Sequence, residues 1–241
     1  MKKERFWEID SARGIAIIKM VIFNYSFALS FLNIYIFNIG LLFPGWAAAV
    51  FIFLVGLSLT ISYNRVKKNK PKEIYIKFFS RGLKVFSLGI LISIITFLTF
   101  PEYFIIFGIL HLIGISIIIG QFFLKFRRLN IILGTLVIIL GLNLQNFVFN
   151  FPWLLWLGFT PKQYSMFDYF PILPWFGFTL LGIAFGNTFY KNGKRIFKIR
   201  DFSNNFIVRF LSMLGRNSLL IYLVHQPLLI MFLLALGFKI F

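Results

Sequence analysis

The stretch GIAIIKMVIFNYSFALSFLNIYIF, residues 14–37, decides the fold of this chain. It contains one charged side chain, Lys19, and is long enough to cross the hydrocarbon core of a bilayer, which takes about 20 apolar residues. Further apolar runs follow at residues 45–63, 82–100, 103–125, 129–149, 171–189 and 217–238. Backbone exposed to lipid must satisfy its hydrogen bonds within the segment, so each run is predicted to be a helix. The sequence therefore predicts an all-α, polytopic membrane helical bundle with about seven transmembrane helices, forming a single domain over residues 1–241.

The composition agrees with a membrane protein. Hydrophobic residues make up 59% of the chain and charged residues 13%, whereas a soluble domain has about 25% charged residues. The net charge of +18 comes from Lys and Arg in the gaps between the apolar runs, so membrane topology explains it and we expect no nucleic-acid partner. The chain has no Cys, which excludes disulfides, thiolate metal sites and a Cys nucleophile; we expect no metal.

Basic residues alternate from gap to gap. The stretch before the first run and the gaps after the second, fourth and sixth runs contain Lys2, Lys3, Arg5, Arg13, Arg65, Lys67, Lys68, Lys70, Lys72, Lys77, Arg81, Lys125, Arg127, Arg128, Lys191, Lys194, Arg195, Lys198, Arg200, Arg209 and Arg216. The other gaps contain no cation at 38–44, Glu102 alone at 101–102, and Lys162 with Asp168 at 150–170. Because cytoplasmic loops are enriched in Lys and Arg, we predict a multi-pass protein of the cell membrane with its N-terminus in the cytoplasm and its C-terminus outside.

Two segments differ from the spans. Residues 151–158 (FPWLLWLG) are apolar but too short to span, so they are predicted to lie at the outer interface or to re-enter, with Trp153 and Trp156 at headgroup depth. Residues 202–214 (FSNNFIVRFLSML) are predicted to form an amphipathic segment on the inner surface.

Polar side chains within spans are candidate functional groups because they are costly in lipid. The only two histidines, His111 and His225, both fall in spans, and Asn24 of the first span reaches a similar depth. These three could converge on one buried pocket, or each could hydrogen-bond a neighbouring helix. His225 is followed by Gln226 and by Pro227, which removes a helical hydrogen bond nearby, so the second interpretation is weaker there.

Both faces of the bundle offer further candidates. At the inner ends of the spans, Arg side chains and small hydrogen-bond donors could bind phosphate, although basic residues are expected there in any case. Asp10 and Arg13 are three residues apart and could pair on one helix face. The inner candidates are Asp10, Arg13, Arg81, Lys84, Arg216 and Asn217. On the outer face, Asp168 and Trp175 bound the segment DYFPILPW (168–175), where Asp168 could orient a polar acceptor or cap a helix.

With these residues in view, the sequence resembles a known family. The opening RFWEIDSARGIAIIKMVIFNYS resembles the start of the heparan-alpha-glucosaminide N-acetyltransferase catalytic-domain family and its prokaryotic members. The resemblance continues in FIFLVGLSLTISYNR, KFFSRGLKVFSLGILI, FGILHLIGIS, DYFPILPWFG and GRNSLLIYLVHQP. These blocks cover most of the chain in the expected order, and the last also resembles the broader transmembrane acyltransferase group.

The resemblance implies acyl transfer across a membrane, with acetyl-CoA as the co-substrate and a sugar-like acceptor. Asn24 matches the Asn of the first-span motif in the animal enzyme, and His225 matches the His of the closing motif. Many prokaryotic relatives have a His at the position of Asn24 and an Asp four residues on, where this chain has Ala28. The animal enzyme also has a His soon after its Asn, and none occurs here between Asn24 and His111.

Two function classes follow. The first is a membrane-embedded N- or O-acetyltransferase that moves acetyl from cytosolic acetyl-CoA to an amino sugar or another small polar acceptor. In it, His225 or His111 would act as base, and Asn24 or Gln226 would donate to the oxyanion. The alternative is a small-solute or lipid transporter or binding protein on the same scaffold. A homodimer is compatible with either class.

Overall fold

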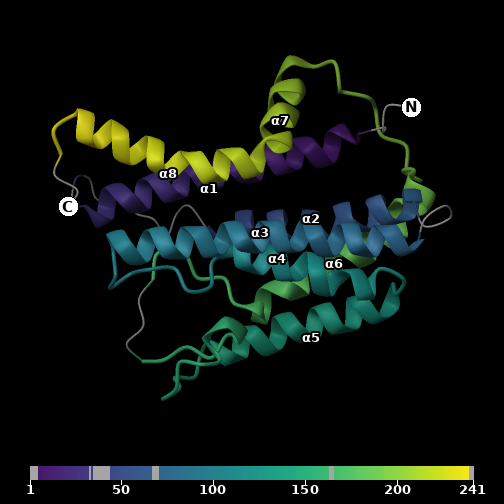
Figure 1. Ribbon diagram of the computed structural model, residues 1–241. Helices are drawn as coiled ribbons and strands as arrows, with labels where there is room; N and C mark the ends of the chain where they lie inside the picture. Colours follow the sequence, from purple (N-terminus) through teal and green to yellow (C-terminus); the bar gives the residue numbers. More distant parts are fainter. Residues whose placement is uncertain (1–4, 33, 35–43, 67–70, 163–165, 239–241) are drawn as a thin grey trace. The chain divides into compact units, whose positions relative to one another are not determined.

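The computed structural model describes residues 5–32, 34, 44–66, 71–162 and 166–238. The basic residues Lys2, Lys3, Lys67, Lys68 and Lys70 lie outside the described residues, as does most of the gap at 38–44. The helices, shown in Figure 1, are α1 (Trp7–Phe31), α2 (Pro44–Val66), α3 (Pro71–Thr99), α4 (Ile109–Gly120), α5 (Arg128–Leu144), α6 (Ile172–Phe189), α7 (Phe206–Arg216) and α8 (Ser218–Ala235). Short 3-10 turns occur at η2 (Gln121–Phe123), η3 (Leu155–Leu157) and η4 (Lys191–Gly193).

The prediction of an all-α fold is confirmed, since every element named in the described part of the chain is a helix. Among the described residues, five helices (α1, α2, α3, α6 and α8) are long and apolar enough to cross a membrane. The other two predicted spans are shorter apolar helices, Ile109–Phe123 and Arg128–Leu144. At 1.5 Å per residue, 15 to 17 residues reach about 22–26 Å, less than a hydrocarbon core of about 30 Å. The total of seven spans and the orientation therefore stay predictions.

The chain divides into two compact units, which we describe separately. Unit 1 comprises Met1–Phe51 and Ile199–Phe241, and unit 2 comprises Ile52–Lys198. The two ends of the sequence thus fold together in unit 1, and the boundary between the units falls within α2.

Unit 1 brings together α1, α7 and α8. In Figure 1, α8 runs alongside α1, whereas α7 lies across the first part of α1. Glycines allow this crossing to be close. A Cβ at Gly14 would lie 2.0 Å from the carbonyl oxygen of Leu211, and a Cβ at Gly215 would lie 1.8 Å from that of Asp10. Small residues are typical of such close contacts between helices in membranes.

Unit 2 contains the rest of α2 and the helices α3 to α6. Its core is apolar, with Ile52, Leu112 and Ile183 each fully buried. Glycines again bring helices together, since a Cβ at Gly56 would lie 2.0 Å from the carbonyl oxygen of Thr179. Helix α3 also exposes large apolar side chains, among them Leu98, which is 76% exposed. Such exposure is expected of a helix that faces lipid.

Two sequence-level details are resolved by the structure. The predicted segment 202–214 is helical only from Phe206 on, because Asn205 caps the helix, and that helix, α7, continues to Arg216. It is amphipathic, since it exposes large apolar side chains on one side and buries Ser212 and Gly215 on the other. The short segment 151–158 contains the single turn η3, with Trp153 70% exposed and Trp156 42% exposed. Its place at the outer interface stays a prediction.

Candidate functional site

Asn24 and His225 meet within unit 1. Nδ2 of Asn24 on α1 lies 3.1 Å from Nε2 of His225 on α8, and the histidine is 6% exposed. Asn24 is 11 residues beyond Arg13, so the pair lies about 16 Å along α1 from that arginine. The structure thus brings two of the three predicted polar side chains together in a buried position.

The neighbours of His225 fix its tautomer. Nδ1 lies 2.7 Å from the carbonyl oxygen of Tyr222, one turn earlier in α8. A carbonyl only accepts, so Nδ1 carries the proton and Nε2 of the neutral ring has a lone pair. That lone pair accepts an N–H from Asn24, and the amide nitrogen also lies 2.8 Å from the sulfur of Met20. The amide orientation and the tautomer are therefore consistent with each other.

Tyr25 supports the same stretch of α8. Its hydroxyl donates to the carbonyl oxygen of His225 at 2.8 Å, and the two rings stack with centroids 6.2 Å apart. Pro227 lies inside α8, where it cannot donate the N–H that a helix residue normally gives to the carbonyl four positions earlier. Gln226 is half-buried and takes no part in these contacts.

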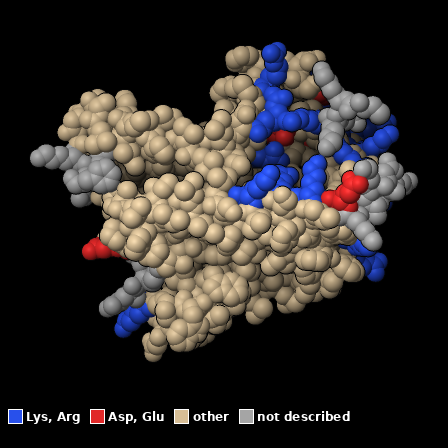
Figure 2. All heavy atoms as spheres, viewed as in Figure 1, with Lys and Arg blue, Asp and Glu red and all other residues tan. Residues whose placement is uncertain are grey.

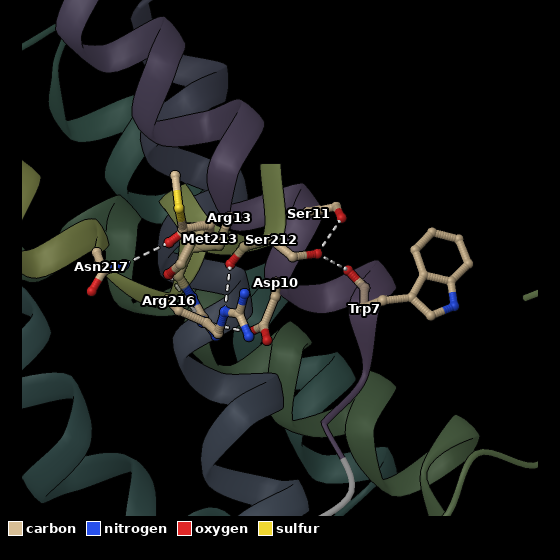
Figure 3. A network of polar contacts seen from close by, with 9 residues as sticks. Trp7, Asp10, Ser11, Arg13, Ser212, Met213, Arg216 and Asn217 are labelled. Atoms are coloured by element: carbon tan, nitrogen blue, oxygen red, sulfur yellow. Dashed lines mark hydrogen bonds and ion pairs between the residues drawn. The ribbon is translucent and has the colours of Figure 1, made fainter. Parts of the chain in front are cut away.

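A polar network joins α1 and α7 near the start of α1 (Figure 3). The hydroxyls of Ser11 and Ser212 are 2.8 Å apart, and Ser212 also donates to the carbonyl oxygen of Trp7 at 3.4 Å. Arg13 pairs with Asp10 at 3.2 Å, as the sequence predicts, and lies 3.5 Å from the carbonyl oxygen of Gly215. This guanidinium therefore lies where α1 meets the end of α7.

Arg216 and Asn217, the other predicted phosphate-binding residues of unit 1, lie at the end of α7. Nε of Arg216 donates to the carbonyl oxygen of Ser212 at 3.1 Å, and the side chain is otherwise exposed. Nδ2 of Asn217 donates to the carbonyl oxygen of Met213 at 2.9 Å (Figure 3). The segment 215–218 thus joins two helices, and the amide of Asn217 bonds back to α7 at the start of α8.

Arg81 and Lys84 belong to unit 2. Both lie in the first half of α3 and are exposed. Their joint site with Arg13 and Arg216, which lie in unit 1, stays a prediction.

His111 belongs to unit 2 and makes structural contacts there. Its Nδ1 accepts from the backbone N–H of Gly108 at 3.2 Å, so Nε2 carries the proton in the neutral ring, 3.5 Å from the hydroxyl of Ser93. The imidazole packs edge-on against Phe86 and over Phe107, and a Cβ at Gly89 would come within 3.0 Å of the ring. These contacts correspond to the predicted alternative of bonding within the helix bundle. The predicted convergence of His111 with Asn24 and His225 stays a prediction.

Asp168 and Trp175 also lie in unit 2. Oδ2 of Asp168 accepts from the backbone N–H of Ile109 at 3.0 Å, so the carboxylate caps α4. Gly108 permits this approach, because a Cβ there would lie 2.3 Å from the same oxygen. Trp175 is half-buried against Phe170, with ring centroids 4.9 Å apart. Asp168 therefore does cap a helix, although that helix is α4 and not the nearby α6.

Tyr169 orders the loop beside Asp168. Its hydroxyl donates to the carbonyl oxygen of Leu155 at 2.8 Å and lies 3.3 Å from that of Thr160. Burial raises the pKa of the Tyr169 phenol above its usual 10.0, with the contact to Thr160 opposing that shift. The loop is thus held by a neutral phenol at ordinary pH.

Several residues of these sites were not predicted. Tyr25 has no periodic signal that separates it from other aromatic residues of the span. The carbonyl of Tyr222 is invisible in a sequence. Ser11 and Ser212 could have been recognised as small polar residues at a helix contact, a type common in membrane proteins. Among the described residues, no group of three His, Asp or Glu side chains is arranged to hold a metal ion.

The fold and these contacts define a helical membrane protein with a buried His–Asn pair between two of its helices. Comparison with known families then gives a match to "Heparan-alpha-glucosaminide N-acetyltransferase, catalytic" over residues 5–227, and the chain belongs to this family. The match covers most of the sequence and confirms the resemblance seen in its motifs. The family is one of membrane acetyltransferases. No curated protein and no solved structure matches the chain.

Proposed function

We propose that this protein is a membrane-embedded acetyltransferase that moves an acetyl group from acetyl-CoA to an amino sugar or another small polar acceptor at the outer side. The observation that supports it most is the contact between Asn24 and His225. An imidazole whose Nδ1 is held by a carbonyl has its basic lone pair at Nε2, as a general base requires. In the resting arrangement that lone pair accepts from Asn24.

The chemistry then needs Asn24 to turn aside as the acceptor enters. Nε2 of His225 takes the proton from the acceptor's amine or hydroxyl while that atom attacks the thioester carbonyl. The amide of Asn24, released from the imidazole, donates to the developing oxyanion. As the C–S bond breaks, the imidazolium returns its proton to the departing thiolate. In a second route Nε2 itself attacks the thioester carbonyl, the C–S bond breaks with release of the coenzyme A thiolate, and the acetyl group on Nε2 is then transferred to the acceptor when the acceptor's amine or hydroxyl attacks it.

The donor is proposed to enter from the inner side. Arg13 and Arg216 lie at the end of unit 1 that would face the cytosol, and guanidinium groups are suited to phosphate oxygens. The acetyl end would then have to reach about 16 Å along α1 to the level of Asn24. Arg81 and Lys84 of unit 2 are further candidates for the phosphates, and Trp175 is a candidate for the acceptor.

His225 is proposed as the base in preference to His111. Nδ1 of His111 accepts a backbone N–H that caps α4, and Nε2 therefore has no lone pair in the neutral ring. The first span also has Ala28 where many prokaryotic relatives have an Asp, so the Asn24–His225 pair has to act without that carboxylate.

The test measures cleavage of acetyl-CoA, and transfer to glucosamine, by purified protein in lipid vesicles. His225→Ala is expected to lower turnover by roughly a hundredfold or more, because general-base catalysis contributes about 10²–10⁴-fold. Val224→Ala is the matched control, since Val224 is the preceding residue of α8 and is 38% exposed. Unchanged turnover in His225→Ala would remove this histidine from the mechanism. Binding of an unmodified polar solute without any dependence on coenzyme A would favour the transporter alternative.

A further inference from the structure

Helix α7 has one face that the rest of unit 1 holds and one that it leaves uncovered. The held face contains Val208, Leu211, Ser212 and Gly215, which contact the first turns of α1 through the Ser11–Ser212 bond and the close approach of Gly14 to Leu211. Because these contacts lie along most of the helix, α7 is fixed to α1 in one orientation, across its axis (Figure 1).

The uncovered face of α7 is apolar. Phe206 is 82% exposed, Ile207 64%, Phe210 47% and Met213 46%. At 100° per residue, Phe206, Phe210 and Met213 share the side of the helix opposite the contact with α1. Helix α8, which follows in the chain, also exposes apolar side chains, with Leu220 61% and Leu228 50% exposed. An apolar face of this size on a helix too short to span needs a partner.

Cations border this face. Arg209 and Arg216 are exposed and, being seven residues apart, lie on one side of α7, between its apolar face and its contact with α1. Arg200 is close in sequence and lies over the ring of Phe202, with its guanidinium carbon 5.7 Å from the centroid. Figure 2 shows Lys and Arg on the visible side of α7, whereas the visible surface along α8 is free of charge.

We propose that α7 docks on the surface of an anionic phospholipid leaflet, with Phe206, Phe210 and Met213 among the acyl chains and Arg209 at the phosphates. Three observations select this occupant. The apolar face is left uncovered by the rest of unit 1, it is bordered by cations that complement acidic headgroups, and α7 lies across a helix long enough to span the bilayer. Because α7 is joined to α1 beside Arg13, leaflet composition then affects how the inner end of unit 1 is held. The proposal does not depend on the enzymatic activity.

The absence of Cys from the chain makes a direct test possible, since each single-Cys variant takes one label. Phe210→Cys reports the apolar face. Leu220→Cys, on the exposed surface of α8, is the reference for lipid, and Asn204→Cys, exposed just before α7, is the reference for water. Each variant is labelled with an environment-sensitive fluorophore in vesicles that contain phosphatidylglycerol. The quenching of the fluorophore by nitroxide-bearing lipid, which reaches labels in the bilayer, is compared with its quenching by iodide, which reaches labels in water.

The proposal predicts that the label at 210 behaves like the one at 220, with lipid quenching several-fold stronger than iodide quenching. It is overturned if the label at 210 behaves like the one at 204. It is also overturned if the label is protected from both quenchers while unlabelled Phe210→Cys forms disulfide-linked dimers, because a second copy of the chain would then cover this face.

The role of charge is tested in the same system. Replacing phosphatidylglycerol by phosphatidylcholine is expected to weaken the lipid quenching of the label at 210. Adding Arg209→Gln to Phe210→Cys is expected to weaken that quenching in the anionic vesicles but not in the phosphatidylcholine vesicles. Equal quenching in both vesicle types, with and without Arg209→Gln, would contradict the preference for an anionic leaflet. Leu220→Cys provides the control, since its quenching should not depend on headgroup charge.

Discussion

At the scale of single residues, the two nitrogens of His225 have different partners, and this difference determines what the side chain can do. The N–H at Nδ1 donates to the carbonyl oxygen of Tyr222, and Asn24 donates to Nε2. His111 has the opposite arrangement, because Nδ1 accepts a backbone N–H. Two histidines that look alike in the sequence, each a lone imidazole in an apolar run, therefore have different tautomers and different possible roles.

Tyr25 should stabilise the segment of α8 around Pro227. Tyr25→Phe removes the hydroxyl that donates to the carbonyl of His225 but keeps the stacked ring, and should lower the free energy of unfolding by about 1 kcal/mol. Tyr25→Leu, which also removes the ring, should cost more. Thermal unfolding of the detergent-purified proteins measures both. If Tyr25→Phe is as stable as the parent protein, the hydrogen bond contributes nothing.

The sequence indicated Asn24 and His225 because polar groups are rare in spans, so each one is conspicuous. It could not indicate which atoms they contact. The Tyr222 carbonyl has no side-chain signature, and the Asp168 cap joins residues 59 positions apart through a loop whose path is not encoded in any periodicity. Arg13 and Asp10 were predictable as a pair because a helix places residues three apart on one face.

At the scale of helices, the apolar runs located every long helix but misplaced several ends. Helix α3 begins at Pro71, well before the predicted start at 82, because polar residues such as Glu73 and Lys77 continue the helix beyond its apolar part. Helix α4 begins at Ile109, after the predicted 103, because Gly108, His111 and Asp168 together cap its first turn. Hydrophobicity marks what lipid covers, whereas helix ends depend on local hydrogen bonds.

The crossing of α1 and α7 should depend on glycine. Gly14→Ala places a Cβ 2.0 Å from the carbonyl oxygen of Leu211, and backbone cannot yield as a flexible side chain can, so the free energy of unfolding should fall by about 3 kcal/mol or more. Gly120→Ala is the matched control, since its Cβ would have no neighbour nearer than 3.5 Å. Thermal unfolding in detergent measures both variants. Equal melting temperatures for Gly14→Ala and the parent would show that α7 is not held this closely.

At the scale of the whole molecule, the charge pattern predicts more membrane spans than the helix lengths alone support. In the described part of the chain five helices are long enough to span, and α4 and α5 are short. The alternation of basic and non-basic gaps nevertheless predicts that both cross. The division into two units, with the two ends of the sequence in one of them, had no counterpart in the sequence pattern, because hydrophobicity reports burial and not which helices are neighbours.

Labelling with a membrane-impermeant maleimide tests that topology. Glu102, Arg127, Asn150 and Asn204 are exposed residues in four successive connections, so a single Cys at each should report one side of the membrane. We expect labelling of Glu102→Cys and Asn150→Cys in intact cells, and of Arg127→Cys and Asn204→Cys only after permeabilisation. If Glu102→Cys and Arg127→Cys label on the same side, α4 does not cross the membrane, and the prediction of seven spans is wrong.

The most direct test of the central proposal, that Asn24 and His225 act as one catalytic pair, is a double-mutant cycle on acetyl-CoA cleavage. Turnover is measured for the parent, Asn24→Leu, His225→Ala and the double variant, all reconstituted in the same vesicles. Residues that act as a unit are strongly non-additive, so the double variant should be no slower than His225→Ala alone. Losses that simply multiply, or full activity in either single variant, would contradict a shared role.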